Sequence, residues 1–384
     1  MNFHSPLHIE EKMSTSDMLY PTWLEINLSA VAHNTRRLLE RTGVDLMAVV
    51  KANAYGMGAV PIGREMLAAG AKALAVARYC EAAVLRQEGI EAPILVFGMT
   101  TLPEVDAALG QEVRMTLHSR ENAERISQRA KALGKTAKVH LKIDTGMGRL
   151  GVMAEEAGEF AAFAVGLGGI EIEGIYTHFA MIDDEPNDPM APVQMERFRR
   201  AVEGVREVGV NPRWLHTANS AAAMGYPQSW MNMTRAGSVL VGIRPFYFEP
   251  FPAEMRRVLS WKAQLASCRR LPDGWGLSYG QVYRTRGAEW IGVLPVGYAD
   301  GFRRVYDNEV LMNGRRVPVV GRVCADACMV KLDQTYPEGT EVVLLGQQGQ
   351  EAIQIEDLSA RWKTSQADVT AVINARIPRV YVRD

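Results

Sequence analysis

Short apolar runs alternate with helical segments over roughly 200 residues, and this alternation constrains the fold more than any other feature of the sequence. Eight runs have the length and composition of buried strands, namely 46–50, 74–77, 94–97, 115–117, 139–143, 170–176, 214–217 and 233–236. Strands that are covered on both faces of a parallel sheet have such nearly continuous apolar sequences. The pattern predicts an α/β fold, a (β/α)8 TIM barrel at residues 29–250. A doubly wound open sheet is the alternative, but the GxGxxG turn typical of such sheets is absent from this sequence.

The pattern changes after residue 254, where strand-like runs follow one another without helices between them. These runs are 261–267, 290–296, 309–312, 317–323, 329–332 and 341–345. Asn313-Gly314 lies between two of them and is a strong hairpin signal. We therefore expect a mostly β C-terminal domain at 251–384, with a strand at 22–28 that packs on it. Residues 1–20 are expected to form a disordered tail.

The composition excludes several classes of function. Hydrophobic residues make up 47% of the chain, charged residues 23%, and the net charge is −1, so no basic surface for nucleic acid is indicated. No apolar run approaches the roughly 18 residues of a membrane span. The cysteines suit neither a disulfide framework nor a metal site; they are Cys80, Cys268, Cys324 and Cys328. We expect a cytoplasmic protein with reduced cysteines and without metal, nucleic-acid partner or membrane attachment.

Lys51 follows the run 46–50 directly, at the point where the strand is expected to end. Lysine is almost never buried without a partner, so a lysine at the end of a buried strand suggests a functional role. A desolvated lysine loses its proton readily and becomes a nucleophile. The small residues at 52–58 predict a loop that lets a ligand approach the backbone. The alternative is a strand end whose lysine reaches to solvent.

Further chemically capable residues also follow predicted strands, where barrel enzymes carry their active sites. They are Arg149, His178, Asn219, Ser220 and Arg235. Arg149 is suited to clamp a carboxylate by two parallel hydrogen bonds, although a surface arginine in a loop is the alternative. Ser220 is expected at a helix N-terminus, where backbone amides attract phosphate, and Gly237 and Ser238 add small residues nearby.

The segment Val50-Lys-Ala-Asn-Ala-Tyr-Gly-Met-Gly58 resembles the pyridoxal 5'-phosphate signature of the alanine racemases. Other motifs agree with that family in order and spacing; they are Lys142-Ile-Asp-Thr-Gly-Met-Gly-Arg149, Gly174-Ile-Tyr-Thr-His-Phe-Ala180, His216-Thr-Ala-Asn-Ser-Ala221, Arg235-Ala-Gly-Ser238 and Gly276-Leu-Ser-Tyr-Gly280. The resemblance covers nearly the whole chain. It implies a pyridoxal phosphate-dependent racemase that interconverts L- and D-alanine, with D-alanine biosynthesis as its expected role and alanine breakdown as the alternative.

By this resemblance, Lys51 holds the cofactor as a Schiff base and also acts as one catalytic base. Tyr279 is the second base, on the opposite face of the substrate α-carbon. In the family the β-domain loops reach the partner's barrel, so the resemblance implies a homodimer with shared active sites. The implied cofactor-binding residues are Lys51, Tyr55, His178, Asn219, Ser220, Arg235, Gly237 and Ser238.

The resemblance also implies how a small amino-acid substrate is held. Arg149 and the backbone amide of Ala325 would meet its carboxylate. Lys142 corresponds to a lysine that is often carbamylated in the family, which would make it an anion that steadies Arg149. Tyr298 and Asp326 belong to loops that narrow the substrate entrance.

Arg235 is implied to face the pyridine nitrogen of the cofactor. A guanidinium keeps its proton, so the nitrogen stays unprotonated and the cofactor becomes a weaker electron sink. A decarboxylase of the same architecture is expected to carry an acidic residue there, and Arg235 argues against it. A cofactor carrier without catalysis would need the barrel alone, and Tyr279 in a second domain argues against that alternative.

The sequence departs from the family at Ala325, where methionine is usual. The smaller side chain widens the expected pocket. A racemase with a broader range of small amino acids, alanine and serine, is therefore the alternative to strict alanine specificity.

Overall fold

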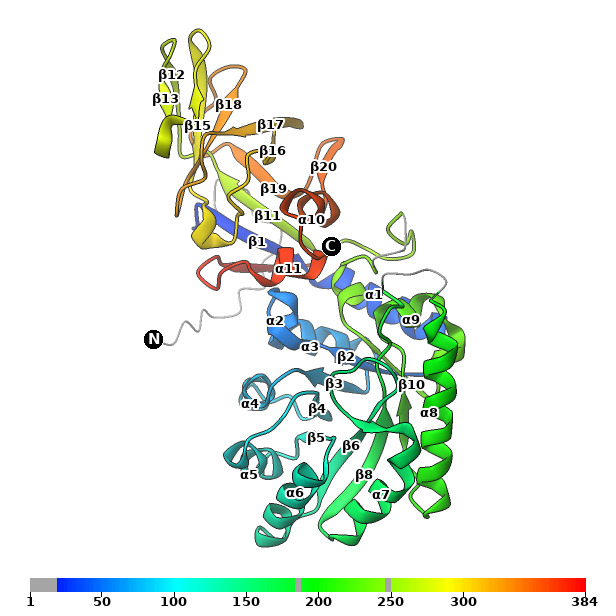
Figure 1. Cartoon of the computed structure of the whole chain (residues 1–384). Coiled ribbons are helices and arrows are strands. Elements are labelled where there is room, and N and C mark those ends of the chain that lie inside the picture. The colour runs from blue at the N-terminus through cyan, green and yellow to red at the C-terminus, as the bar shows by residue number, and fades with distance from the viewer. Residues whose placement is uncertain (1–18, 184–187, 246–249) are drawn as a thin grey trace. The chain divides into compact units, whose positions relative to one another are not determined.

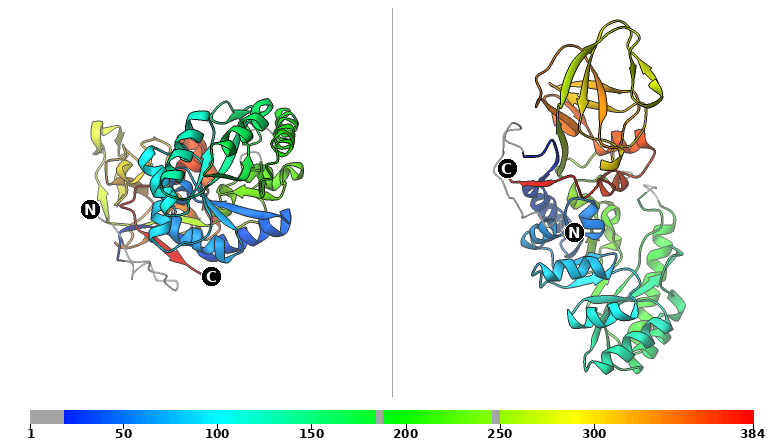
Figure 2. Two further views of the ribbon diagram at one scale, coloured as in Figure 1. Left: turned by 90° about the horizontal axis from the view of Figure 1, so that it is seen from below. Right: turned by 90° about the vertical axis from the view of Figure 1, so that its left-hand side faces the viewer.

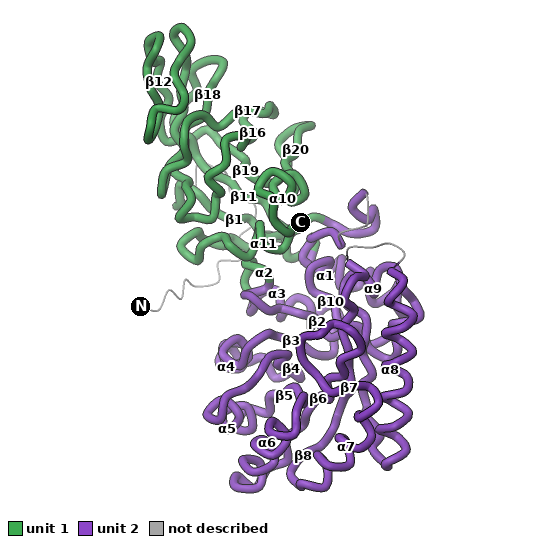
Figure 3. Tube along the Cα trace, in the orientation of Figure 1, with its two compact units in different colours: residues 1–30, 55–58, 257–384 green, residues 31–54, 59–256 purple. Residues whose placement is uncertain are grey.

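The computed structural model describes residues 19–183, 188–245 and 250–384, so the predicted tail at 1–20 lies almost wholly outside the described residues. The chain divides into two compact units, which Figure 3 shows in separate colours. Unit 1 contains the chain up to Ala30, Tyr55–Gly58 and Arg257–Asp384, and unit 2 contains Val31–Ala54 and Ala59–Arg256. The chain thus enters unit 1 for four residues shortly after Lys51.

Unit 2 is built on parallel strands in the order β10-β2-β3-β4-β5-β6-β8-β9, with the short β7 beside β6. Their bounds are β2 (Asp45–Val49), β3 (Ala73–Val76), β4 (Ile94–Val96), β5 (Arg114–Leu117), β6 (Ala137–Asp144), β7 (Val152–Met153), β8 (Ile170–Tyr176), β9 (Trp214–His216) and β10 (Met233–Ala236). The last strand, β10, pairs in parallel with the first, β2, which nearly closes the sheet into a barrel (Figures 1 and 2). The predicted TIM barrel is confirmed.

Helices connect these strands and cover the outside of the barrel (Figure 1). They are α1 (Leu28–Thr42), α2 (Lys51–Tyr55), α3 (Ala59–Ala68), α4 (Tyr79–Gln87), α5 (Leu102–Gly110), α6 (Arg120–Ala132), η2 (Ala154–Glu156), α7 (Ala157–Gly166), α8 (Met190–Glu207), α9 (Ser220–Gly225), η3 (Pro227–Ser229) and η4 (Ser238–Val241). In α8 the residues Met195, Phe198, Val202 and Val205 recur at helical spacing and are all buried. Helix α6 begins at Ser119, whose hydroxyl accepts a hydrogen bond from the Asn122 amide.

Side chains from alternate positions of the strands pack together inside the barrel. Met47 and Val49 of β2 point to the same face of the sheet and pack with Ala73, Leu95 and Trp214. The barrel interior is therefore a packed core, as in TIM barrels generally.

Unit 1 contains a sheet with the order β12-β15-β18-β17-β16-β19-β11-β1-β21, with β20 paired to β19, and a separate two-stranded ribbon of β13 and β14. The strands are β1 (Thr22–Asn27), β11 (Leu259–Gln264), β12 (Ser267–Leu271), β13 (Gly276–Leu277), β14 (Tyr283–Arg284), β15 (Glu289–Leu294), β16 (Glu309–Met312), β17 (Arg315–Val320), β18 (Cys328–Leu332), β19 (Glu341–Gln348), β20 (Glu351–Ile353) and β21 (Arg379–Val382). Strand β1 runs antiparallel to β11 and parallel to β21. The unit also contains η5 (Tyr279–Gln281), η6 (Tyr298–Asp300), α10 (Ile355–Trp362) and α11 (Gln366–Ala371).

The hairpin predicted at Asn313-Gly314 is confirmed. Met312 of β16 pairs with Arg315 of β17, and Asn313 and Gly314 between them have φ values of 50° and 71°. Two consecutive positive φ values match the right-handed twist of the flanking strands, which is why Asn-Gly is favoured there.

Two local predictions were wrong, and two helices had not been predicted. The run 261–267 is not one strand, because the chain changes neighbours between β11 and β12: the Leu265 amide donates to Thr340 O and the Ala266 amide donates to Val293 O. The helices α10 and α11 were not expected in the β domain. The residues after Lys51 form a left-handed turn instead of an open loop. Among the described residues, no helix combines the length and apolar character needed to cross a membrane.

Candidate active site

The predicted barrel residues gather at the C-terminal ends of the strands. Lys51 comes shortly after β2, His178 shortly after β8, and Asn219 shortly after β9, while Arg149 lies in the loop after β6. Arg235 differs from the prediction, because it lies within β10 and not after it. Its position in the strand directs the guanidinium toward the partners described below.

Lys51 begins a turn of unusual backbone conformation. Ala52, Asn53, Ala54 and Tyr55 all have φ between 51° and 56°, in the left-handed region. For a residue with a Cβ this conformation costs on the order of 1–2 kcal/mol, so four in succession need strong support from their surroundings. Such strain occurs most often at functional sites.

The ammonium of Lys51 lies in an environment that favours loss of its proton. Burial by the surrounding protein lowers the pKa of Lys51, and the charge of Arg149 lowers it further, while Glu81 and Asp183 oppose the shift. The residue still keeps solvent access. A lower pKa increases the fraction of neutral amine, which is the form that acts as a nucleophile or base.

Arg235 is buried in the barrel lumen with 4% of its surface exposed. Its guanidinium donates to three backbone carbonyl groups, those of Thr177 (2.7 Å), Thr217 (3.1 Å) and His216, and lies 3.4 Å from Nδ1 of His178. Burial lowers the pKa of Arg235 to about 10, so the group stays protonated near neutrality. The carbonyl groups fix the direction of the guanidinium.

Two histidines that the sequence analysis assigned no role lie beside Arg235. Nδ1 of His216 is 3.2 Å from an Arg235 nitrogen, and Nε2 of His216 is 2.8 Å from Nδ1 of His140. Because a guanidinium only donates, Nδ1 of His216 accepts, and its Nε2–H donates to His140. The remaining proton of His140 is on Nε2, which is 3.6 Å from a carboxylate oxygen of Glu173, an ion-pair distance longer than a hydrogen bond.

His140 and His216, which are linked to each other by a hydrogen bond, are both neutral. Burial lowers the pKa of His140, and it lowers the pKa of His216 well below the ordinary value. Burial opposes ionisation of Glu173, but the contacts from His140 and Arg114 prevail and hold its pKa at about 2. The sequence signal for this buried hydrogen-bonded series was a histidine within each of two apolar strands, His140 in β6 and His216 in β9.

Lys142 is another buried cation of the lumen, with 3% of its surface exposed. Burial lowers its pKa to about 7, and Arg235 contributes to the shift. The ammonium lies 5.1 Å from the ring centre of Tyr176, and that ring stacks on His216 with 4.9 Å between the centroids. The pKa of Lys142 therefore lies close to neutral pH, far below that of an exposed lysine.

The loop that carries Arg149 is organised by Asp144. One oxygen of this carboxylate accepts hydrogen bonds from the amides of Gly146 (2.9 Å), Met147 (2.9 Å) and Gly148 (3.1 Å). Burial opposes ionisation, but these hydrogen bonds outweigh it and lower the pKa of Asp144. The carboxylate thus shapes a tight loop that places Arg149 at its end.

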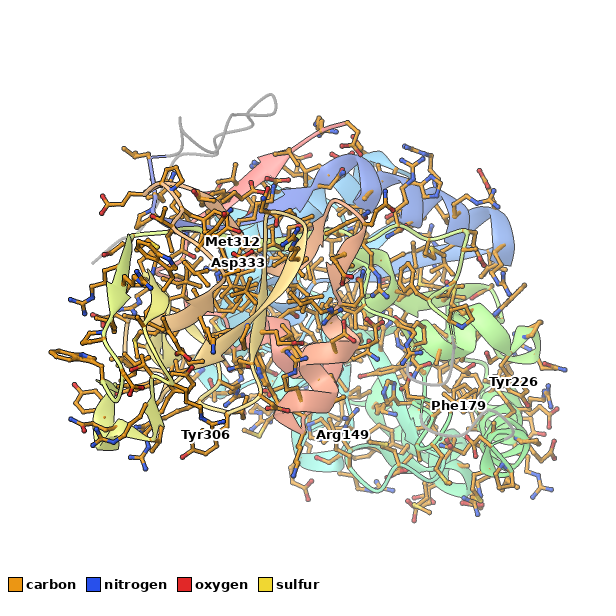
Figure 4. The ribbon with its side chains drawn as sticks, turned by 90° about the horizontal axis from the view of Figure 1, so that it is seen from above. Arg149, Phe179, Tyr226, Tyr306, Met312 and Asp333 are labelled. Atoms are coloured by element: carbon orange, nitrogen blue, oxygen red, sulfur yellow. The ribbon has the colours of Figure 1, made fainter. Side chains whose placement is uncertain are left out.

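The segment that holds His178 is anchored by neighbouring side chains. Gln194 accepts a hydrogen bond from the Ala180 amide and donates one to the carbonyl of His178. The ring of Phe179 packs edge-on against Tyr226 with 5.9 Å between the centroids, and Figure 4 shows the two residues close together. His178 is therefore held at the end of β8 by backbone contacts.

The residues after β9 and β10 form a compact polar group. The Ser220 hydroxyl accepts a hydrogen bond from the Gly237 amide at 3.1 Å. Asn219 caps α9 by accepting from the Ala222 amide at 3.0 Å and donates to Asp183 at 2.7 Å. Ser238 follows at the start of η4. The hydrogen bond brings Ser220 and Gly237 into direct contact.

The remaining predicted residues belong to unit 1. Tyr279 begins the short helix η5, and 68% of its surface is exposed. The preceding residue, Ser278, has a φ of 59° and donates a hydrogen bond to Arg322 O at 2.6 Å. The loop with Tyr298 lies against that with Ala325, because the Tyr298 amide donates to Cys324 O. Asp326 continues the second loop.

Tyr55 is grouped with unit 1, in the segment Tyr55–Gly58. Arg379 donates a hydrogen bond to Gly56 O at 3.0 Å, and Tyr381 donates one to Met57 O at 3.0 Å. A Cβ on Gly56 would lie 2.3 Å from Thr370 O. Only glycine fits there, so the end of this turn is tightly packed.

The barrel site concentrates positive charge. The pKa of His178 lies well below its usual value, first because of burial and then because of Arg235, Lys142, Arg149 and Lys51. The negative charges of Asp144 and Asp183 offset only part of the positive charge of these four cations. The fold and this site define a TIM-barrel enzyme suited to anionic ligands, such as carboxylates and phosphates.

Comparisons with known proteins identify the family. Residues 26–245 match the family model "Alanine racemase, N-terminal domain", and residues 258–381 match "Alanine racemase, C-terminal domain". The alanine racemase of Desulfovibrio desulfuricans is 39% identical over 368 residues, 94% of this chain and 98% of that protein. The alanine racemase of Geobacillus stearothermophilus is 39% identical over 376 residues, with 96% and 95% covered. The chain belongs to the alanine racemase family.

Solved structures agree with this assignment. The alanine racemase of Streptomyces lavendulae superimposes with a TM-score of 0.90 at 32% identity, over 95% of this chain and 98% of that one. The Bacillus anthracis enzyme with bound L-Ala-P has a TM-score of 0.90 at 36% identity, over 96% of both chains. The likeness therefore extends over both units of the chain.

Proposed function

We propose that this protein is a pyridoxal phosphate-dependent alanine racemase that interconverts L- and D-alanine by a two-base mechanism. The observation that carries the proposal is Lys51, a lysine with a lowered pKa beside Arg149 at the end of β2 in a chain of this family. Every relative described above is named an alanine racemase, which favours alanine over a broader range that includes serine.

The barrel residues fit the cofactor. Their excess of positive charge suits a phosphate, and Ser220, Gly237 and the neighbouring Asn219 and Ser238 offer hydroxyl, amide and backbone groups for it. Lys51 would hold the cofactor covalently, with Tyr55 and His178 also contacting it. When bound, pyridoxal phosphate supplies the electron sink that makes the substrate α-proton acidic.

Arg235 would meet the pyridine nitrogen of the cofactor. Its three carbonyl acceptors fix the guanidinium, and its pKa of about 10 keeps it a donor near neutrality. A cation at this position leaves the ring nitrogen unprotonated, which moderates the electron sink. This buried cation opposes the decarboxylase alternative, which needs an acidic group at the same place.

Two bases on opposite faces account for inversion at the α-carbon. The neutral amine of Lys51 takes or returns the proton on one face. On the other face we propose Tyr279 of a second copy of the chain, so that the enzyme is a homodimer with shared active sites. Support comes from Tyr279 lying in unit 1 with 68% of its surface exposed, available to a partner subunit.

Arg149 and the backbone amide of Ala325 would hold the substrate carboxylate, and Tyr298 and Asp326 would narrow the entrance. We further propose that Lys142 is carbamylated. Its pKa of about 7 provides the neutral amine that reacts with carbon dioxide, and the resulting anion would offset part of the positive charge around Arg149. The loss of this positive charge would also remove one of the charges that lower the pKa of His178.

We propose that the enzyme acts in D-alanine biosynthesis. We also propose a cytoplasmic location, because the four cysteines are all unpaired in the structure, as is usual in a reducing compartment.

Chiral analysis of the products tests the proposal directly. Purified protein incubated with L-alanine and pyridoxal phosphate should yield equal amounts of both enantiomers. Lys51→Ala should abolish the conversion and the adduct that borohydride traps, whereas Lys72→Ala, at an exposed position before β3, should change neither. An adduct that maps to another lysine would remove the assignment of Lys51.

A further inference from the structure

The left-handed turn after Lys51 is held by a residue to which the proposed mechanism assigns no role. Glu81 of α4 accepts a hydrogen bond from the Ala52 amide with one carboxylate oxygen. Its other oxygen accepts from the amides of Ala77 (2.8 Å) and Arg78 (3.0 Å). A single carboxylate therefore ties the backbone that follows β2 to the backbone that follows β3.

This arrangement exceeds what helix capping requires. Glu81 is the third residue of α4, where a carboxylate ordinarily bonds only the amide at the start of its own helix. Glu104 in α5 shows the ordinary case, because its oxygen Oε2 accepts from the amide and hydroxyl of Thr101. Glu81 adds a third acceptor contact, directed to the residue immediately after Lys51.

The turn needs such support. Four consecutive residues with a Cβ have φ above 50°, a conformation that persists only where the surroundings enforce it. Within the turn, Ala54 donates to Val50 O, and Asn53 accepts from the Ala59 amide. The Ala52 amide has Glu81 as its acceptor, and hydrogen bonds to an ionised carboxylate are about twice as strong as neutral ones.

We propose that Glu81 is a positioning residue for Lys51, because its carboxylate fixes the first peptide group after the lysine and thereby the direction of the lysine side chain. This inference rests on the proposed role of Lys51. The negative charge of Glu81 also favours the protonated form of the free Lys51 amine, because it opposes the lowering of the Lys51 pKa.

The test compares Glu81→Gln with Glu104→Gln in the full-length holoenzyme. In Glu81→Gln, an NH2 group replaces one of the two acceptor oxygens. Either the Ala52 amide or the amides of Ala77 and Arg78 then lose their acceptor. We expect hydrogen exchange at the amides of residues 51–55 to accelerate about tenfold or more in Glu81→Gln. We expect kcat to fall about ten- to a hundredfold with KM for alanine within about threefold, because Arg149 is untouched.

Glu104→Gln removes a capping carboxylate of the same kind from the next helix and should leave exchange at 51–55, kcat and KM as in the wild type. Normal exchange at 51–55 in Glu81→Gln, or equal effects in Glu104→Gln, would overturn the proposal. Should Glu81→Gln fold poorly, Glu81→Asp keeps the charge but is one methylene shorter, and it should also accelerate exchange at Ala52. Exchange is independent of racemisation, so a wild type without racemase activity would contradict the proposed function alone.

Discussion

His140 and His216 lie side by side in the barrel lumen, with Nδ1 of His140 2.8 Å from Nε2 of His216. They connect Arg235 at one end to Glu173 at the other, and every group in this chain is largely buried. Since Arg235 only donates, the protons of both imidazoles are directed toward Glu173. A carboxylate deep in the barrel is thus linked to the arginine that we place at the cofactor.

Breaking this chain at His140 should destabilise the protein. In His140→Leu, the buried Nε2–H of His216 loses its acceptor, whereas the carboxylate of Glu173 keeps its contacts with Arg114 and Lys138. Leaving one buried donor unpaired costs about 1–3 kcal/mol, so we expect a loss of that size in the free energy of unfolding. Urea denaturation measures it. The effects of His140→Leu and Glu173→Gln should not add in the double variant, and strict additivity of the two changes would contradict the coupling between these residues.

The pKa of Lys142 predicts how stability depends on pH. The folded-state pKa of about 7 lies below the unfolded value of 10.5, so the unfolded chain binds more protons between these limits. The free energy of unfolding should therefore rise with pH from 7 upward, by up to about 1.4 kcal/mol per pH unit from this group. In bicarbonate-free buffer, wild type minus Lys142→Met should show this rise between pH 7 and 9. A difference that does not change with pH would show that Lys142 carries no free amine, as carbamylation predicts.

Shared active sites predict complementation between inactive variants. Lys51→Ala and Tyr279→Phe homodimers should each lose nearly all racemase activity. When the two are mixed and allowed to exchange subunits in equal amounts, half of the dimers are mixed and one of their two sites has both native bases. The activity should then approach about one quarter of the wild-type value. If exchange is demonstrated by mass and activity stays absent, both bases come from one chain.

The hairpin between β16 and β17 predicts a stability difference between two glycines. Gly314 has a φ of 71° and only an ordinary contact, to Gln348 O at 3.8 Å, so Gly314→Ala acts through the backbone alone. We expect it to destabilise the protein by about 1 kcal/mol. Gly166 ends α7 and has open space where a Cβ would lie. Gly166→Ala should be neutral or stabilising by about 0.5 kcal/mol in the same thermal or urea unfolding measurements.

The sequence by itself determined the strands of the barrel, the hairpin at Asn313-Gly314 and the position of Lys51 at a strand end. Each of these depends on a pattern within a few residues. A buried parallel strand is apolar along its whole length, and a two-residue hairpin needs two positive φ values. Such local requirements can be read without knowing which segments meet.

Only the tertiary structure decided the features that join distant segments. The left-handed turn after Lys51 is held in part by Glu81, 29 residues away from Ala52, which accepts a hydrogen bond from the Ala52 amide. The pair of His140 and His216 spans 76 residues and depends on the register of strands that pack in the lumen. The division between β11 and β12 follows from hydrogen bonds to two other segments, one just before β19 and the other in β15. The physical reason is common to all three, because a backbone or side-chain conformation that is unfavourable alone becomes stable only when a partner from elsewhere in the chain is held against it.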